Sequence, residues 1–371
     1  MKRFGNLFTR IIDRENIALA YQNAKKGKGH YSEVIEVESN LEYYLECVHQ
    51  LLSTKTFNTA PYKERYIDDI GKMRKVYILP YFPDRIVHHA IMNVLQPIWD
   101  KTFIYDCYSA VPGKGLHPCL HRLRDSLRDV ENTQYCLKFD IRKYYPSVNH
   151  DILMGFLERK IKCKDTLWLL ENIVRSAEGN TNIPIGNYLS QYFANIYLNR
   201  FDHWLKEEKR VKYYFRYCDD GIVLHGDKEF LGNLLCEVQE YMDSLRLELN
   251  SKTQIFPVDK RGIDFLGYRS FRTYTLLRKS SAKRFKKRIQ RIERNPTKLS
   301  PETIVSSIMS YYGWLKHCDG YNFLSKYVLW NARIYNIVRD SCLRLGIKNS
   351  LRRLRWYEVL LDPMKSFYGI N

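Results

Sequence analysis

The alternation of apolar and polar positions predicts a chain built from helices and short strands. Residues 1 to about 60 are expected to be mostly helical, because apolar side chains recur at roughly helical spacing at Ile35, Leu41, Leu45, Val48 and Leu52. The stretch "KVYILPYFPDRIVHHAIMNVLQPIWD" that follows predicts a short strand, two prolines and a helix from about Asp84.

Two acidic motifs interrupt the apolar pattern of the central region. The stretch "QYCLKFDIRKYYPSVNHDIL" predicts a strand that ends near Asp140, a turn through Pro146, and a helix capped by Asn149. A helix over residues 189–206 precedes "FRYCDDGIVL", which predicts a strand, a tight turn and a second strand, with Asp219 and Asp220 at the hairpin tip. Further on, "KEFLGNLLCEVQEYMDSLRLEL" predicts a helix running toward another strand, and "GIDFLGYRSFRTYTLLRK" predicts a hairpin.

A strongly basic amphipathic helix is predicted over "KSSAKRFKKRIQRIERNPTK". Phe285, Ile289 and Ile292 form its apolar stripe, and the rest of its surface is crowded with cations at Lys283, Arg284, Lys286, Lys287, Arg288 and Arg291. Such a surface can be merely solvated, or it can lie along a phosphate backbone. Both readings stay open, although the scarcity of acidic residues in the helix favours phosphate contact.

The composition narrows the class of partner. The 371 residues include 60 Lys and Arg against 41 Asp and Glu, a formal net charge of +19, so we expect a polyanionic partner, nucleic acid before a membrane surface. Nine cysteines without a Cys-x-x-Cys pair predict reduced thiols in a cytosolic setting, with neither disulfides nor structural zinc. Charged residues interrupt the N-terminal apolar stretch, which predicts a soluble, cytoplasmic protein without a signal peptide.

The carboxylates at the strand ends call for a cation. Asp219 and Asp220 are adjacent, and repulsion between them raises their pKa values unless a positive partner is shared. Asp140 also follows a strand directly. Three carboxylates at adjacent strand ends can hold two Mg²⁺ ions about 3.5–4 Å apart, an arrangement that serves phosphoryl transfer.

These motifs, taken in order, resemble those of a reverse transcriptase. "YCDD" (217–220) and "FDIRKYYPSV" look like its palm, "FLGY" (265–268) resembles its primer grip, and "RKVYILPYFPDRIVHH" resembles the fingers of bacterial members. The likeness covers roughly residues 55–330. It implies an α+β right-hand polymerase with an antiparallel palm sheet and a helical thumb. The expected parts are a helical extension (1–60), fingers (61–135), a palm (136–275) with a fingers insertion near 150–180, a thumb (276–345) and a basic tail (346–371).

The resemblance also implies roles for individual residues. Asp140 and Asp219 would be the principal Mg²⁺ ligands, Asp220 would complete the catalytic triad, and the Ile141 carbonyl would also ligate metal. Nucleotide contacts would come from Arg74, Lys75, Tyr145, Ile185, Gly186 and Lys252, with Tyr145 as the gate against a ribose 2′-hydroxyl. The primer grip would be Phe265, Leu266, Gly267 and Tyr268, and the nucleic-acid backbone would meet Lys283, Lys287, Arg288 and Arg291.

One segment departs from most of the family. "IGNYLSQ" (185–191) has Ile185 where most reverse transcriptases have Gln, and Gln191 where they have Pro. This pattern is similar to that of reverse transcriptases of diversity-generating retroelements. The similarity implies copying of a template-repeat RNA, with dNTPs, into cDNA with errors at adenines, and an oligomeric basic helical-bundle accessory variability protein as partner.

Other readings remain. A retron, CRISPR-associated or phage-defence reverse transcriptase would share the palm, and an inactive RNA-binding scaffold would share the fold. The short basic tail "SLRRLRWYEVLL" leads us to expect no endonuclease domain, which disfavours a full-length group II intron protein.

Overall fold

The computed structural model describes residues 3–68 and 73–346, and the predicted basic tail lies outside this part except for its first residue. The described chain forms two compact units. The first comprises residues up to Cys119 together with Glu131–Phe256, and the second comprises Leu120–Val130 together with the chain from Pro257 onward. No helix in the described ranges is both long and apolar enough to cross a bilayer.

The N-terminal part of the first unit is helical, as predicted. It contains α1 (Leu7–Ile11), α2 (Arg14–Lys25), α3 (Ser32–Ser39) and α4 (Leu41–Ser53). Val48 and Leu52 are buried on α4, but Ile35 is 54% exposed on α3. Its assignment to the same apolar stripe is wrong, because the helix breaks at Asn40, where φ is −146° and ψ is 61°.

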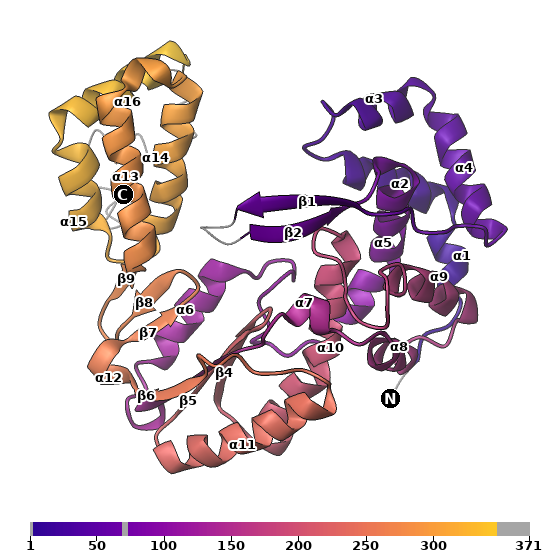
Figure 1. The fold of residues 1–371 in the computed structure, drawn as a ribbon, viewed down its shortest axis with the longest axis horizontal. Helices are drawn as coiled ribbons and strands as arrows, with labels where there is room; N and C mark the ends of the chain where they lie inside the picture. Colours follow the sequence, from indigo (N-terminus) through magenta and orange to yellow (C-terminus); the bar gives the residue numbers. More distant parts are fainter. Residues whose placement is uncertain (1–2, 69–72, 347–371) are drawn as a thin grey trace. The chain divides into compact units, whose positions relative to one another are not determined.

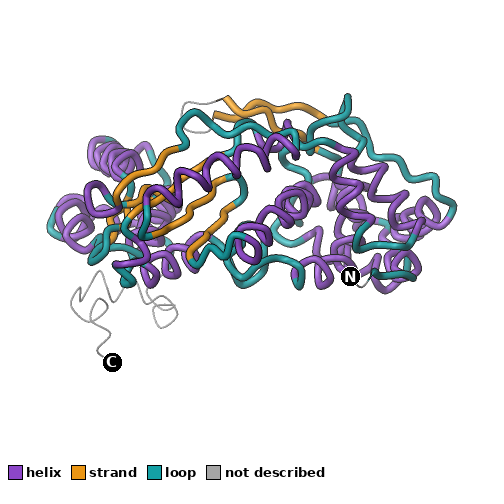
Figure 2. Tube along the Cα trace, turned by 90° about the horizontal axis from the view of Figure 1, so that it is seen from below, coloured by secondary structure: helices purple, strands orange, loops and turns teal. Residues whose placement is uncertain are grey.

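A two-stranded hairpin follows, formed by β1 (Lys63–Asp68) and β2 (Met73–Ile78). Its two strands form a separate sheet, drawn in orange at the top of Figure 2. Next comes α5 (Ile86–Asp100), which starts two residues after the predicted Asp84. Apolar residues on several of its sides are buried, and it packs against α2, so α5 is an interior helix.

The central sheet of the first unit has the order β4-β5-β3-β6, and β5 pairs antiparallel with both β4 and β3. Its strands are β3 (Tyr135–Asp140), β4 (Tyr213–Tyr217), β5 (Asp220–His225) and β6 (Gln254–Pro257). Helix α11 (Lys228–Ser244) packs on β3 and β5 (Figure 1). The other helices of the first unit are α7 (Tyr144–Ser147), α8 (His150–Glu158), α9 (Lys164–Val174) and α10 (Tyr188–His203), whereas α6 (Leu116–Ser126) belongs to the second unit from Leu120 on.

The local predictions for this region hold with one exception. The Asn149 side chain accepts a hydrogen bond from the Ile152 N–H and caps α8, and the acidic hairpin joins β4 to β5. Pro146, expected in a turn, instead lies in the short helix α7. Lys143 before it has φ 46°, so the left-handed residue reverses the chain and proline is tolerated in the first helical turn.

The second unit joins a small sheet to a helical bundle. Its elements are α12 (Val258–Arg261), β7 (Ile263–Phe265), β8 (Tyr268–Ser270), β9 (Thr275–Leu277), α13 (Lys279–Arg294), α14 (Pro301–Leu315), α15 (Tyr321–Leu324) and α16 (Ala332–Arg344). The predicted stripe of α13 is buried at Phe285, Ile289 and Ile292, and the Phe285 ring stacks on Tyr311 at 4.2 Å. Helices and antiparallel sheets together confirm the α+β prediction.

A buried ion pair joins the central sheet to α10. Arg216 of β4 donates from Nε to Asp202 Oδ1 at 2.7 Å and from Nη2 to Asp202 Oδ2 at 2.6 Å. The two side chains are 1% and 0% exposed. Asp202 also accepts from the Tyr214 hydroxyl, and Arg216 Nη1 donates to Asn195 Oδ1. A buried charge pair tolerates this desolvation only when its hydrogen bonds are complete, as they are here.

We therefore predict that Arg216→Met lowers the free energy of unfolding of the first unit by about 3–5 kcal/mol, because Asp202 would keep an unpaired buried charge. Urea denaturation followed by tryptophan fluorescence measures this change. The exposed Arg14–Glu46 pair, 66% and 41% exposed, supplies the control. Arg14→Met should lower the free energy by less than about 1 kcal/mol. Equal effects of the two substitutions would contradict the prediction.

Candidate active site

Strand register brings the three predicted carboxylates together. In the antiparallel pairing of β3 with β5, Asp140 lies opposite Asp220, and Asp219 is the residue before β5 in the turn from β4. The Ile141 N–H donates to the Asp219 carbonyl at 3.3 Å, so Asp219 also lies against the end of β3. All three side chains are half-buried. Residues 80 positions apart in sequence therefore share one end of the sheet.

Asn250, which the sequence reading missed, holds Asp140 in place. Its main-chain N–H donates to the Asp140 carbonyl at 2.7 Å, and its side-chain Nδ2 donates to Asp140 Oδ2 at 3.0 Å. The Asn250 Oδ1 atom in turn accepts from the Lys252 N–H. Through Asn250, the turn that carries Lys252 lies beside Asp140. Lys252, which was predicted to contact the nucleotide, is exposed in this turn. Asn250 and Asp140 are 110 residues apart in sequence, so no local sequence pattern predicts the contact between them.

Gly221 is a second residue that the sequence reading missed. It lies opposite Phe139 in the β3–β5 pair, and a Cβ atom at Gly221 would come within 2.2 Å of the Phe139 ring. Only a residue without a side chain fits there. Close packing of the ring over Gly221 brings β3 against β5 directly beside the carboxylates.

The electrostatics of the site favour a bound cation. Burial first, and then the neighbouring Asp140 carboxylate, raise the pKa of Asp219, while Arg74 opposes the rise. No group of three or more His, Cys, Asp and Glu side chains in the described ranges has the arrangement of a ready-made metal site. The donor set nevertheless fits Mg²⁺, because it consists of carboxylate oxygens whose mutual repulsion a divalent cation relieves.

Tyr145 lies against the acidic turn. The Cys218 thiol approaches its hydroxyl at 3.7 Å, and Cys218 itself has φ 57° in the turn. Burial, followed by the charge of Cys218, raises the pKa of Tyr145 above its ordinary value, so the phenol remains neutral. Tyr144 anchors the same short helix by donating to the Ala194 carbonyl at 2.5 Å. The ring expected to act as a gate is therefore held beside Asp219.

The β1–β2 hairpin separates the two predicted triphosphate contacts. Successive side chains of a strand point to opposite faces, so Arg74 and Lys75 cannot both face the carboxylates. Arg74 acts electrostatically on Asp219. Lys75 instead pairs with Glu64 at 2.5 Å and lies over the Tyr77 ring at 5.2 Å. Of the two cations, Lys75 is thus engaged within the hairpin, whereas the charge of Arg74 acts on Asp219.

The segment at Ile185 fixes this hairpin. The Tyr77 N–H donates to the Ile185 carbonyl at 2.8 Å, and Gly186 adopts φ 108°. A Cβ atom at Gly186 would come within 2.5 Å of the Tyr77 carbonyl oxygen, so glycine is needed for this approach. Asn187 completes the contact by donating to the Tyr62 hydroxyl at 3.2 Å.

The remaining predicted residues lie in the second unit. Phe265 and Tyr268 pair at the ends of β7 and β8, and Leu266 and Gly267 between them have φ 54° and 83°. Tyr268 donates to the Trp314 carbonyl at 2.9 Å, which fixes this turn on α14.

On α13, Lys283, Lys287 and Arg291 are exposed, whereas Arg288 donates to the Ser307 hydroxyl at 2.7 Å and is half-buried. Three of the four cations predicted to meet a backbone are therefore free to reach a phosphate, and Arg288 also ties α13 to α14.

Comparison with known proteins identifies relatives of the chain. A family model described as reverse transcriptase (RNA-dependent DNA polymerase) matches residues 61–270, more than half of the chain. The chain is 24% identical over 320 residues to protein YkfC of Escherichia coli strain K12, covering 73% of this chain and 84% of that protein. It is 23% identical over 219 residues to the group II intron-encoded protein LtrA of Lactococcus lactis subsp. cremoris, covering 56% of this chain and 36% of LtrA.

Among solved structures, the chain is similar to telomerase from Candida albicans in complex with a fragment of telomeric RNA. The TM-score is 0.44 at 13% identity, and the match covers 84% of this chain and 67% of that one.

Gly221→Ala should destabilise the first unit by about 1–3 kcal/mol, because the added methyl group overpacks the contact with Phe139. Gly232→Ala is the matched control. Gly232 lies within α11 with open space around its Cβ position, so alanine there should be neutral or stabilise by about 0.5–1 kcal/mol. Urea unfolding of the two variants measures the difference, and equal stabilities would refute the packing argument.

The raised pKa of Asp219 predicts the response to pH and metal. The folded state holds the Asp219 proton to higher pH than the unfolded chain does, so in EDTA stability should fall as pH rises from the ordinary carboxyl pKa, about 3.9, through the raised one. At neutral pH, Asp219→Asn should raise the melting temperature in EDTA, and Mg²⁺ should stabilise the wild type but not this variant. Glu240→Gln, an exposed change on α11, is the control. It should leave the fall of stability with pH and the stabilisation by Mg²⁺ as they are in the wild type. A Mg²⁺ response that survives Asp219→Asn would contradict this assignment.

Proposed function

The chain belongs to the reverse transcriptase (RNA-dependent DNA polymerase) family, and on that premise we propose that it is the polymerase of a diversity-generating retroelement. In this proposal it copies a template-repeat RNA into cDNA with errors at template adenines. The family membership carries RNA-directed DNA polymerase activity and the right-hand architecture. The register that sets Asp140 opposite Asp220 is the observation that supports the catalytic assignment.

In the proposed reaction, the primer 3′-hydroxyl attacks the α-phosphorus of a dNTP, and the bond to pyrophosphate breaks as the new P–O bond forms. Asp140, Asp219 and Asp220, with the Ile141 carbonyl, would hold Mg²⁺. When bound, Mg²⁺ supplies the Lewis acid that offsets the developing negative charge. Arg74 offers a forked guanidinium to the triphosphate, with Lys252 as a second cation beside Asp140. The fixed Tyr145 ring would exclude a 2′-hydroxyl.

The mutagenic assignment rests on Ile185 and Gln191. Ile185 holds β2 through its main-chain carbonyl, so the hairpin that carries Arg74 is positioned whatever the side chain is. The side chain is half-buried and apolar, and it can pack against a nascent base pair but cannot donate or accept a hydrogen bond. A contact of this kind discriminates poorly between correct and incorrect pairs.

The nucleic-acid partners follow from the same proposal. Residues 61–135 would act as fingers, 136–275 as palm and 276–345 as thumb. The exposed cations Lys283, Lys287 and Arg291 would follow the template–cDNA backbone, and the turn from Phe265 to Tyr268 would grip the primer. An oligomeric basic accessory variability protein would assemble with the enzyme on the RNA.

A second candidate is a reverse transcriptase of the group II intron type. The similarity to LtrA supports it, although the match spans only about a third of LtrA. This candidate shares the carboxylates and the reaction but requires accurate copying, so fidelity separates the two.

Primer extension on a defined RNA template with Mg²⁺ and dNTPs, followed by sequencing of the products, tests the proposal. We expect errors concentrated opposite template adenines, and Asp219→Asn should lower synthesis at least about a thousandfold through loss of a metal ligand. Uniformly accurate products would favour the intron type, and activity that survives Asp219→Asn would contradict the catalytic assignment.

Ile185→Gln tests the origin of the errors. It keeps the main-chain carbonyl that holds Tyr77 and adds hydrogen-bonding groups, so errors opposite adenine should fall several-fold. Ile185→Val, which preserves an apolar branched side chain, is the matched control and should leave the error pattern unchanged. If Ile185→Gln also leaves the pattern unchanged, the side chain is not the source.

A further inference from the structure

A cavity of about 490 Å³ lies in the first unit, and none of the three proposed catalytic carboxylates lines it. Its walls come from the C-terminal ends of α5, α8, α10 and α11 and from the π-helical turn Trp204–Glu208. The volume falls within the range of small-ligand sites. The cavity therefore has room for a molecule that the polymerase reaction, as described above, does not use.

One wall of the cavity is aromatic. The rings of Trp204 and Tyr241 lie 4.9 Å apart, and Phe201 stacks behind Trp204 at 5.8 Å. These contacts bring the turn after α10 against α11 and hold both side chains in place. A rigid aromatic wall of this kind favours a flat ligand, because nucleobases and aromatic rings gain contact energy with little ordering.

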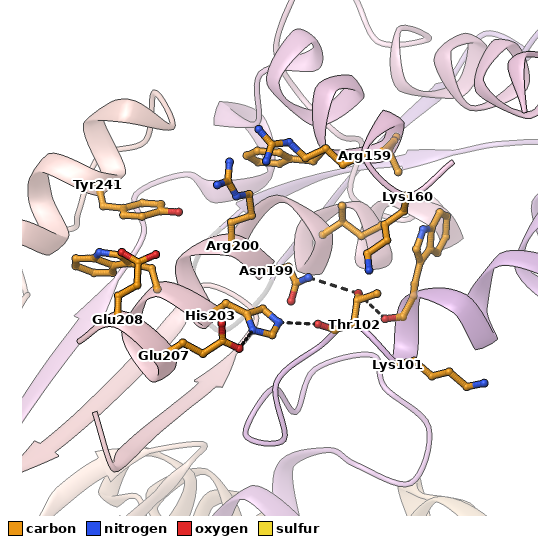
Figure 3. Close-up of a pocket in the computed structure, with 15 residues that line it drawn as sticks. Lys101, Thr102, Arg159, Lys160, Asn199, Arg200, His203, Glu207, Glu208 and Tyr241 are labelled. Carbon is orange, nitrogen blue, oxygen red and sulfur yellow. Dashed lines mark hydrogen bonds and ion pairs between the residues drawn. The ribbon is translucent and has the colours of Figure 1, made fainter. Parts of the chain in front are cut away.

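Cations gather on one side of the opening. Figure 3 shows Arg159, Lys160 and Arg200 on one side of Asn199, with His203 and Glu207 on the other. In the described part of the chain, none of these three cations forms an ion pair with a carboxylate. Arg159 and Arg200 are exposed at the rim, so their guanidinium groups are open to a ligand there. A phosphate group fits this rim.

Asn199 lines the cavity and carries a buried acceptor that has no hydrogen-bond partner among the described residues. Its Nδ2 donates weakly to the Thr102 hydroxyl at 3.4 Å, and that hydroxyl in turn donates to the Trp99 carbonyl at 2.7 Å. The Thr102 hydroxyl proton is already donated to the Trp99 carbonyl, so the hydroxyl can only accept a hydrogen bond from Asn199. The Asn199 amide therefore has its Nδ2 atom, and not Oδ1, toward Thr102. The buried Asn199 Oδ1 then has no partner among the described residues. Buried acceptors are rarely left unpaired, and a small shift of the Asn199 side chain, held only by the long bond to Thr102, would open Oδ1 to a ligand N–H.

The acidic side of the cavity is largely occupied. His203 Nε2 donates to the Thr102 carbonyl at 2.8 Å, and Nδ1 donates to Glu207 at 2.6 Å. Although burial lowers the pKa of His203, these two hydrogen bonds raise it overall, which favours the charged form of the ring beside Glu207. Glu208 also lines the cavity. It would repel phosphate and accept from ribose hydroxyls, which orients the ligand with its phosphate toward Arg200.

We propose that this cavity binds a ribonucleotide, with its 5′-phosphate on Arg159, Lys160 and Arg200, its base against Trp204 and Tyr241, and a base N–H donating to Asn199 Oδ1. The ligand is either a free mononucleotide or a single nucleotide of an RNA strand, since both present the same groups. Binding at this cavity requires no catalysis.

Calorimetric titration of the full chain in EDTA with AMP and with adenosine tests the site. Arg200→Ala should weaken AMP at least about tenfold and leave adenosine unchanged, because only AMP carries the phosphate. Asn199→Leu should weaken both ligands. Lys228→Ala, which removes an exposed cation from α11 outside the cavity, should weaken neither. Primer extension by the same preparations checks that each variant is folded. If the wild type does not extend a primer, that result contradicts the polymerase assignment and leaves the test of nucleotide binding unaffected.

A 5′-phosphorylated eight-nucleotide oligo(A) RNA distinguishes the two sources. If this RNA displaces AMP from the wild type, and Arg200→Ala weakens the displacement, the natural ligand is a nucleotide within an RNA strand. If AMP binds and the RNA does not displace it, the ligand is a free mononucleotide. Arg200-dependent binding of the RNA when AMP alone does not bind also identifies a strand. Ligand affinities that are the same in the wild type, Arg200→Ala and Asn199→Leu would overturn the proposal, as would the absence of any Arg200-dependent binding.

Discussion

The buried pair of Arg216 and Asp202 is the constraint on which the candidate active site depends. Arg216 sits two residues before Cys218, and besides its two hydrogen bonds to Asp202 it donates to the Cys218 carbonyl at 3.0 Å. One guanidinium therefore fixes β4 to α10 and also sets the turn that presents Asp219. A charge pair with both side chains removed from water tolerates little displacement, because any shift leaves a charge without its partner. The position of the acidic turn is thus set by contacts in the interior of the protein.

Asp140 and Asp219 form a second pair of charges in the same region, but this pair is repulsive, whereas the pair of Arg216 and Asp202 is attractive. Burial of Asp219 and, after it, repulsion from Asp140 both disfavour the charged form, so the site is held together against its own electrostatics. Besides the Asn250 amide on Asp140 Oδ2, main-chain contacts hold it: Ile141 to Asp219 and Asn250 to Asp140. Such contacts survive changes of protonation, and they leave the carboxylate charge available for a cation. Part of what positions the site is therefore independent of the carboxylate charge that its chemistry needs.

The sequence alone predicted the acidic hairpin, the strand before Asp140 and the apolar stripe of α13, because each is written in a short run of residues. It missed Asn250, Gly221 and Arg216, whose roles depend on partners 14 to 110 residues away. Gly221 did carry a signal, as the residue directly after the paired aspartates in a strand. Ile35 was misassigned because the helical spacing of apolar residues continues across the break at Asn40. Pro146 was misassigned because the left-handed Lys143, and not the proline, turns the chain before α7.

The segment Ile185–Asn187 suggests how specificity can change while the fold is kept. Its contacts with the hairpin are the Ile185 carbonyl, the close approach of Gly186, and the Asn187 amide on Tyr62. None of them uses the side chain at position 185. That side chain is consequently free to vary without moving Arg74, whereas Gly186 is not. If the proposed roles of Ile185 and Arg74 hold, a change from a hydrogen-bonding to an apolar residue at position 185 would alter discrimination between base pairs and leave the proposed triphosphate contact in place.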